Sequence, residues 1–279
     1  MSIEGKFLWI WELDRYNDAN INTIIQKANE IGIDGFILKT HDGSSFWYQS
    51  HAIPEIKNAG LKCGAWGYCY GKNVAGEIDA IKKTASFKPD FYVLDIETEF
   101  EAQNMGAVAE QLLLGINNTG IPIGYTSFAI PSYHTVPYNI LSKYCSFTMP
   151  QIYWVEMNRQ LKSVFDTSIS EYKAFNLPVY PVGQITKDVP AEEIVEFSNL
   201  CRSIKTPAIS YWDLQEAGDA QLKAIKESND IEFNDAVKTL QNNGIVKSPD
   251  YWIQNSKQGK TVNGQYVRTL ILRMAQKLK

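Results

Sequence analysis

Short apolar segments and amphipathic segments alternate along most of this chain. Runs rich in β-branched and aromatic residues predict strands, and stretches with apolar residues every three or four positions predict helices. The predicted strands span residues 7–11, 35–40, 62–70, 91–99, 122–128, 147–154, 178–185 and 208–214. The predicted helices span residues 19–31, 51–59, 75–87, 105–117, 138–144, 160–175, 191–203 and 220–227. Eight strand–helix units in roughly 220 residues predict an α/β fold, a (β/α)8 TIM-type barrel over residues 1–226, whereas a doubly wound open sheet usually has fewer units.

The pattern changes after residue 226. Residues 227–230 are polar and predict a break, and residues 231–279 follow as a separate unit. In its last part, Val267, Leu270, Ile271 and Met274 recur at helical spacing. We therefore expect a small all-helical C-terminal module of two or three helices. The alternative is a helix pair that only caps the barrel.

Composition and charge exclude several classes of protein. The net charge of −4 argues against nucleic acid as the main partner. No apolar run approaches the ~20 residues of a membrane helix, so we expect no membrane insertion. The apolar run 7–11 is too short for a signal peptide and is interrupted by Glu12 and Asp14, which predicts synthesis in the cytoplasm without a signal peptide.

Cofactor signals are missing from the sequence. The four cysteines have no CxxC spacing and no histidine cluster, so we expect buried free thiols and no metal site. No G-x-G-x-x-G follows a predicted strand and no P-loop is present, so we expect no nucleotide cofactor. The three histidines, His41, His51 and His134, are not paired in the sequence and are expected to be loop or hydrogen-bonded residues.

Residues 91–99 carry the strongest chemical signal. An apolar and aromatic run leads into Asp95, Glu97 and Glu99 at alternate positions. Side chains of a strand alternate between its faces, so these three carboxylates are predicted to share one face. Crowded carboxylates raise one pKa and leave a neighbour ionised, which suits acid–base catalysis. The alternatives are a solvated edge strand or a cation site.

The other predicted strands also end in polar and aromatic residues. Active sites of (β/α)8 barrels lie at the carboxyl ends of the strands. Tryptophan and tyrosine rings there suit the apolar faces of sugars, while amides and acids suit their hydroxyl groups. The candidate substrate-binding residues are Trp11, Lys39, Trp66, Tyr68, Tyr125, Gln151, Tyr153, Gln184 and Trp212. Asp213 ends the last strand and is a further catalytic candidate beside Glu99. Trp212 has two possible orientations, into the cleft or toward the helices.

Several of these segments resemble known proteins. The Asp95-x-Glu97 pair at the end of a fourth strand resembles the D-x-E of family-25 lysozyme-type glycosidases, which are muramidases on a barrel. Residues 8–11, 39–44, 65–68, 94–97, 149–154 and 212–217 are similar to a group of bacterial and phage glycosidase-like barrel proteins. The lysozymes carry an aspartate near the end of the first strand, where this chain has Trp9, Trp11 or Glu12. Either the substrate is placed differently here, or the activity is lost.

The segment Gly244-Ile245-Val246-Lys247-Ser248-Pro249-Asp250-Tyr251-Trp252 resembles the short helical module of cell-wall amidases and lysins from Gram-positive bacteria and their phages. Together, the resemblances imply a glycosidase that cleaves the glycan of peptidoglycan or another polysaccharide, and that acts at the cell wall if it is released. Glu97 would be the general acid. Asp95 would stabilise the cationic centre, orient an acetamido group or position water. The alternative is a barrel that binds carbohydrate, or serves as a structural phage or cell-wall protein, without catalysis.

Overall fold

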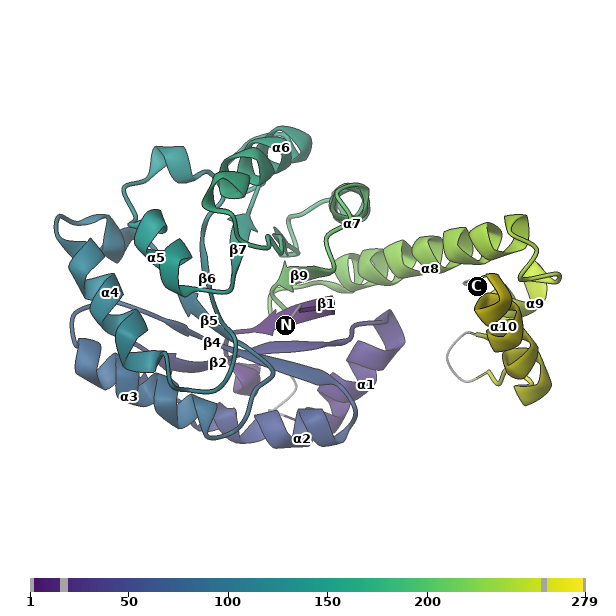
Figure 1. Cartoon of the computed structure of the whole chain (residues 1–279), viewed down its shortest axis with the longest axis horizontal. Coiled ribbons are helices and arrows are strands. Elements are labelled where there is room, and N and C mark those ends of the chain that lie inside the picture. The colour runs from purple at the N-terminus through teal and green to yellow at the C-terminus, as the bar shows by residue number, and fades with distance from the viewer. Residues whose placement is uncertain (1–2, 16–19, 257–259, 278–279) are drawn as a thin grey trace.

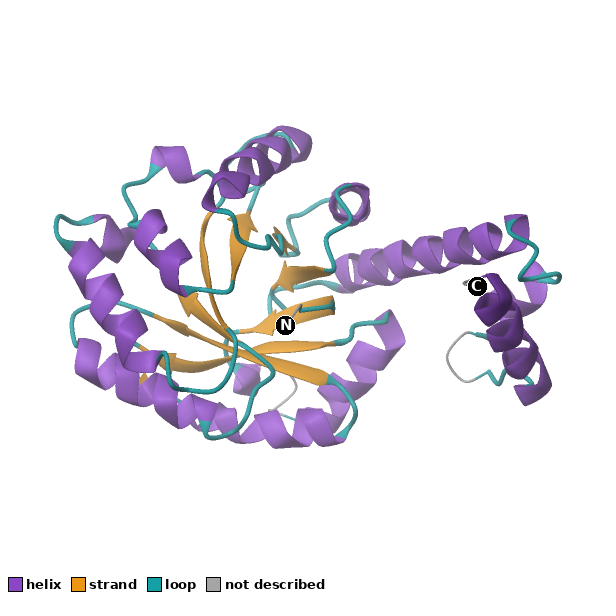
Figure 2. Cartoon of the chain, viewed as in Figure 1, coloured by secondary structure: helices purple, strands orange, loops and turns teal. Residues whose placement is uncertain are grey.

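The computed structural model describes residues 3–15, 20–256 and 260–277, and they contain a closed (β/α)8 barrel followed by C-terminal helices. The sheet has the order β1-β9-β8-β7-β6-β5-β4-β2, and a parallel pairing of β1 with β2 closes it. A short antiparallel strand, β3, extends β2 as a hairpin. Helices surround the strands, as Figures 1 and 2 show. The predicted fold class is confirmed.

The strands are β1 (Gly5–Ile10), β2 (Gly35–Asp42), β3 (Ser45–Phe46), β4 (Lys62–Tyr68), β5 (Tyr92–Asp95), β6 (Ile123–Phe128), β7 (Phe147–Ile152), β8 (Val182–Gln184) and β9 (Ala208–Trp212). The helices are α1 (Ile21–Ile31), α2 (Ala52–Asn58), α3 (Val74–Ala85), α4 (Met105–Ile116), α5 (Tyr138–Tyr144), α6 (Leu161–Tyr172), α7 (Ala191–Ser203), α8 (Asp219–Asn242), α9 (Pro249–Asn255) and α10 (Gly264–Lys277).

Aromatic rings fill the amino-terminal end of the barrel. The ring of Phe91 contacts that of Phe7 edge-on at 5.3 Å between centroids, and that of Phe147 at 5.8 Å. Gly64 and Gly124 make room for them, since a Cβ at either position would lie 2.4 or 2.2 Å from a phenylalanine ring. The interior of the barrel is therefore a packed core that supports the opposite end.

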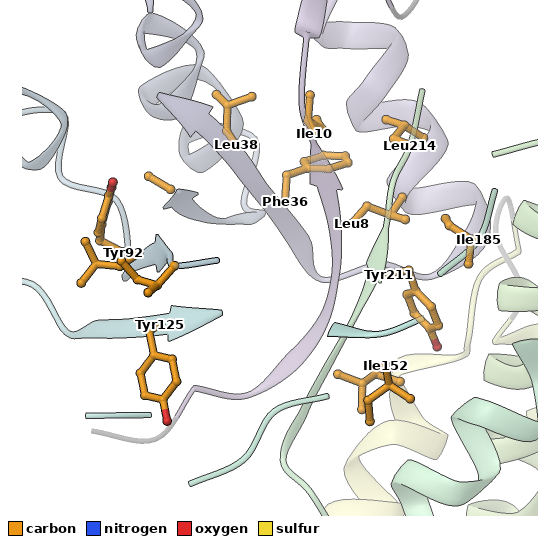
Figure 3. Packing of buried hydrophobic residues seen from close by; sticks show 14 of the residues in the cluster. Leu8, Ile10, Phe36, Leu38, Tyr92, Tyr125, Ile152, Ile185, Tyr211 and Leu214 are labelled. Carbon is orange, nitrogen blue, oxygen red and sulfur yellow. The ribbon is translucent and has the colours of Figure 1, made fainter. Parts of the chain in front are cut away.

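A second apolar layer lies between the strands and the helices. Leu8 and Ile10 of β1 point into this layer, and so do Tyr125 of β6 and Tyr211 of β9 (Figure 3). Helix α1 contributes Ile24 and other residues at helical spacing, and its first turn is capped by Asn20. All four cysteines are buried free thiols, as predicted.

Helix α8 corrects the predicted break at residues 227–230. It runs without interruption over 24 residues, from the barrel to the C-terminal helices (Figure 1). The polar residues of this stretch bind the barrel: the Asn229 side chain donates to the backbone oxygens of Ile31 and Gly32, and Lys6 donates to Asn229. Helices α9 and α10 follow α8, as the helical pattern predicted. No described helix has the length and apolar character that crossing a membrane requires.

Candidate active site

The carboxyl ends of the strands surround a cleft of about 320 Å³. Its floor contains three indole rings, Trp9 from β1, Trp66 from β4 and Trp212 from β9, which contact one another edge-on with centroids 5.3–5.9 Å apart. The indole nitrogen of Trp9 donates to Ser210, and that of Trp66 donates to the backbone oxygen of Ile10. The rings are therefore fixed in place. Trp212 faces the cleft, which decides between its two predicted orientations.

Asp95 and Glu97 lie together on one wall of this cleft. The Nε2 atom of Gln151 donates to Asp95 Oδ1 at 3.2 Å and to Glu97 Oε1 at 2.8 Å. This shared donor holds the two carboxyl groups side by side. The sequence predicted that a shared strand face brings them together, and this is wrong. Strand β5 ends at Asp95, and the backbone of Glu97 leads into a 3₁₀ helix at Thr98–Glu101.

The surroundings of Asp95 favour its protonated form. Burial raises the pKa of Asp95 well above its ordinary value, and the neighbouring Glu97 raises it further. Asp95 is buried, while Glu97 is half-buried and closer to the opening. A proton on Asp95 can therefore be presented to a bound molecule through the more exposed Glu97.

Lys39 of β2 provides the positive charge of the cleft. Its ammonium group lies over three indole rings, at 4.5 Å from Trp47, 5.1 Å from Trp66 and 5.6 Å from Trp11. Asp42 is 3.4 Å away. Burial lowers the pKa of Lys39, but the carboxylate of Asp42 opposes this effect. Rings and carboxylates together hold this cation in a largely dry place.

Tyr68 and Tyr153 place hydroxyl groups around the carboxylate pair. Both residues line the cleft. Burial raises the pKa of Tyr153, so its hydroxyl stays protonated and can donate. Tyr68 donates to Glu99 at 2.6 Å. Glu99 is not among the residues that line the cleft, so it orients Tyr68 rather than joining the pair, contrary to its predicted catalytic place.

Three predicted site residues lie elsewhere. Tyr125 is fully buried in the layer between β6 and the helices, and its hydroxyl contacts Ser142 at 3.2 Å, so it cannot touch a ligand in the cleft. Asp213 is fully buried behind Trp212, where it accepts a hydrogen bond from the Glu216 backbone. Gln184 accepts hydrogen bonds from the backbone after β7 and lines an adjoining hollow. Strand alternation points Tyr125 away from the barrel axis, whereas Asp213 lies beyond the end of β9, where alternation no longer applies.

Some lining residues were not predicted. Trp9 is two positions before Trp11, and the strand period alone could have placed both rings inside. His134 was expected to be a loop or hydrogen-bonded residue, and it is both: its Nδ1 atom is hydrogen-bonded to Glu101, its ring stacks on Phe128 at 3.6 Å between centroids, and both rings line the cleft. His134 comes from the loop after β6, whose course has no periodic signal in the sequence.

No protein-family model matches this sequence, and no curated protein matches it. Solved barrels match its structure. A chitinase from Bacteroides thetaiotaomicron has a TM-score of 0.63 at 7% identity and covers 81% of this chain and 96% of its own. A chitinase from Chromobacterium violaceum has a TM-score of 0.60 at 8% identity, and the match covers 81% of this chain and 99% of the chitinase. A sugar phosphate isomerase/epimerase from Parabacteroides distasonis has a TM-score of 0.51 at 13% identity, and the match covers 82% of this chain and 95% of the isomerase/epimerase. At these identities the similarity shows the fold alone.

Proposed function

We propose that this protein is a glycoside hydrolase that cleaves the glycan of bacterial peptidoglycan. The observation that carries the proposal is the Asp95–Glu97 pair, joined through Gln151, on the wall of an indole-floored cleft. Rings bind the apolar faces of sugars, and a protonated carboxyl group can donate to a glycosidic oxygen. The match to barrels of known glycoside hydrolases is consistent with this chemistry.

Glu97 is the general acid in this proposal. The proton of the pair passes through Glu97 to the leaving glycosidic oxygen as the bond to the anomeric carbon breaks. Inverting glycosidases need a second carboxylate about 6.5–9.5 Å away, and retaining ones need a nucleophile about 5–5.5 Å away across the bond. In this proposal Asp95 takes neither role, because Gln151 Nε2 donates to both carboxyl groups and holds Asp95 beside Glu97 on the same wall.

The missing nucleophile points to the substrate. A 2-acetamido group can supply its own carbonyl oxygen to the anomeric carbon, as in substrate-assisted glycosidases. Water then attacks that carbon, Glu97 takes one proton from the water, and the acetamido group is released. Asp95 and Tyr153 are placed to orient the acetamido group. Peptidoglycan glycan consists of such amino sugars, which is why it is the favoured substrate.

We also propose that the protein acts outside the cell that makes it. The protein would work at the cell wall after release from the cell that makes it, as a lysin or an autolysin. The second candidate function is carbohydrate binding without catalysis, which the same indole floor would also support.

The test is the release of reducing ends from purified Gram-positive sacculi. Glu97→Gln and Asp95→Asn should each lower the rate on the order of 10²-fold or more. Glu30→Gln, on the exposed face of α1, should leave the rate unchanged. Sacculi from which the N-acetyl groups have been removed should not be cleaved. Tight binding of sacculi by the wild type without any turnover would favour the binding protein instead.

A further inference from the structure

We propose that the C-terminal helices contain a second carbohydrate site, which binds an anionic glycan that carries carboxylate or phosphate groups. This site is separate from the cleft and does not depend on the reaction proposed for the barrel. Four observations support it: a cavity, an ordered set of exposed rings, a local excess of positive charge and the position of the module at the end of α8.

The cavity lies among α9, α10 and the segment that precedes α9. It measures about 350 Å³, and its lining includes Lys247, Tyr251, Trp252, Tyr266 and Arg273. Helices α9 and α10 contain no buried residue. Tyr251 and Trp252 are partly buried and Tyr266 is exposed, and all three border the cavity. A cavity of this size accommodates a ligand of one or two sugar rings.

The aromatic rings are held in a fixed arrangement. The ring of Tyr251 contacts Tyr266 at 4.7 Å and Trp252 at 6.0 Å between centroids, both nearly perpendicular. The hydroxyl of Tyr251 accepts a hydrogen bond from the backbone nitrogen of Asn263 at 2.9 Å, which connects the start of α10 to α9. Tyr266 is still half exposed. Rigid, amphipathic rings with free faces suit a flat sugar ring that also has polar groups.

The charge of the module favours an anionic ligand. Residues 244–279 contain seven Lys and Arg and one Asp, in a chain whose net charge is −4. Two of these cations line the cavity. Arg273 donates to the backbone oxygen of Ile245 at 3.0 Å, which fixes its guanidinium there with other N–H groups still available. Lys247 is exposed and has no ion pair among the residues that the structure describes. Carboxylate and phosphate groups are the natural partners of such cations.

Helix α8 separates this site from the cleft. Its first part packs on the barrel through Leu222 and Ile225, and its other end leads into α9 (Figure 1). With 24 residues, it is about 36 Å long at 1.5 Å per residue. The cavity of the module is therefore not a subsite of the cleft, and it would bind a different stretch of a polymer.

The experiment is co-sedimentation of the full-length protein with purified Gram-positive sacculi. Trp252→Ala and Lys247→Glu should each weaken binding at least tenfold, and wild-type binding should decrease as salt increases. Phe233→Ala and Lys238→Glu, both on exposed positions of α8, are the matched controls and should bind as the wild type does. Circular dichroism establishes that each variant is folded, and Lys247→Glu keeps the test valid if Trp252→Ala unfolds.

Two further arms identify the ligand. Sacculi stripped of their attached phosphate polymers show which anionic group is bound. If the protein no longer binds them, the ligand group is phosphate; if it still binds them, the ligand groups are carboxylates of the peptidoglycan. Either result supports the site. The proposal is overturned if both cavity variants bind like the wild type, if the controls weaken equally, or if the protein binds phosphatidylglycerol vesicles or DNA but not sacculi. The measurement is sedimentation and not the release of reducing ends, so failure of the barrel's proposed reaction would leave this result unaffected.

Discussion

Replacing Asp213 by asparagine should stabilise the protein at neutral and alkaline pH. Asp213 is fully buried, and burial raises its pKa from 3.8 to about 7. The folded state therefore keeps this proton over a pH range in which the unfolded state has lost it. Stability falls as pH rises from about 4 to 7, because the folded state binds more protons than the unfolded state there. Asparagine removes this dependence.

The size of the effect follows from the two pKa values. A difference of about 3 pH units, at about 1.4 kcal/mol for each, gives about 4 kcal/mol above pH 7. The substitution keeps the oxygen that accepts from the Glu216 backbone at 3.0 Å. The other oxygen of Asp213 has no partner among the described residues, so an amide there resembles the protonated acid.

Thermal melts at pH 4 and pH 8 provide the assay. The variant should match the wild type at pH 4 and melt roughly 10 °C higher at pH 8. Asp79→Asn, on the exposed face of α3, is the matched control and should show no such difference. If Asp213→Asn has the same advantage or none at both pH values, Asp213 is not held as a neutral acid, and the argument from burial is wrong.

Four other outcomes are expected. Trp212→Ala should raise KM for glycan several-fold while the barrel stays folded, as binding titrations and a melt can establish. Tyr125→Phe should leave hydrolysis of a soluble glycan unchanged, because that hydroxyl faces Ser142; a large loss of activity would contradict its placement. A chain that ends at Asn243 should stay soluble and hydrolyse soluble fragments. A chain that ends at Ser228 should melt at a lower temperature, since it lacks the contacts of Asn229 with the barrel.

The barrel could be predicted because each of its units repeats the same signal. An apolar strand and an amphipathic helix alternate eight times, and the period of each segment is independent of the loops between them. What the pattern could not tell is which face of a strand points inward. Strands of a closed parallel barrel are apolar on both faces, so Tyr125 and Thr126 are equally acceptable inside. Gly124 indicates which face of β6 points inward, because its lack of a side chain makes room for the Phe147 ring inside the barrel.

Only part of the candidate site could be predicted from the sequence. Asp95 and Glu97 lie on the cleft as expected, but through the turn after β5 and not through strand alternation. Sequence patterns do not encode the course of such turns. The break predicted at residues 227–230 is wrong because polar residues in a helix need not face solvent. The side chain of Asn229 binds backbone oxygens of the barrel.

The phenylalanine rings at the amino-terminal end of the barrel determine how material moves through the site. Because Phe7, Phe91 and Phe147 close that end, and Gly64 and Gly124 let the rings meet, the barrel has no passage along its axis. A chain entering the cleft cannot thread through the protein. Whatever binds there must arrive and depart by the same mouth, so release of one product clears the route for the next substrate.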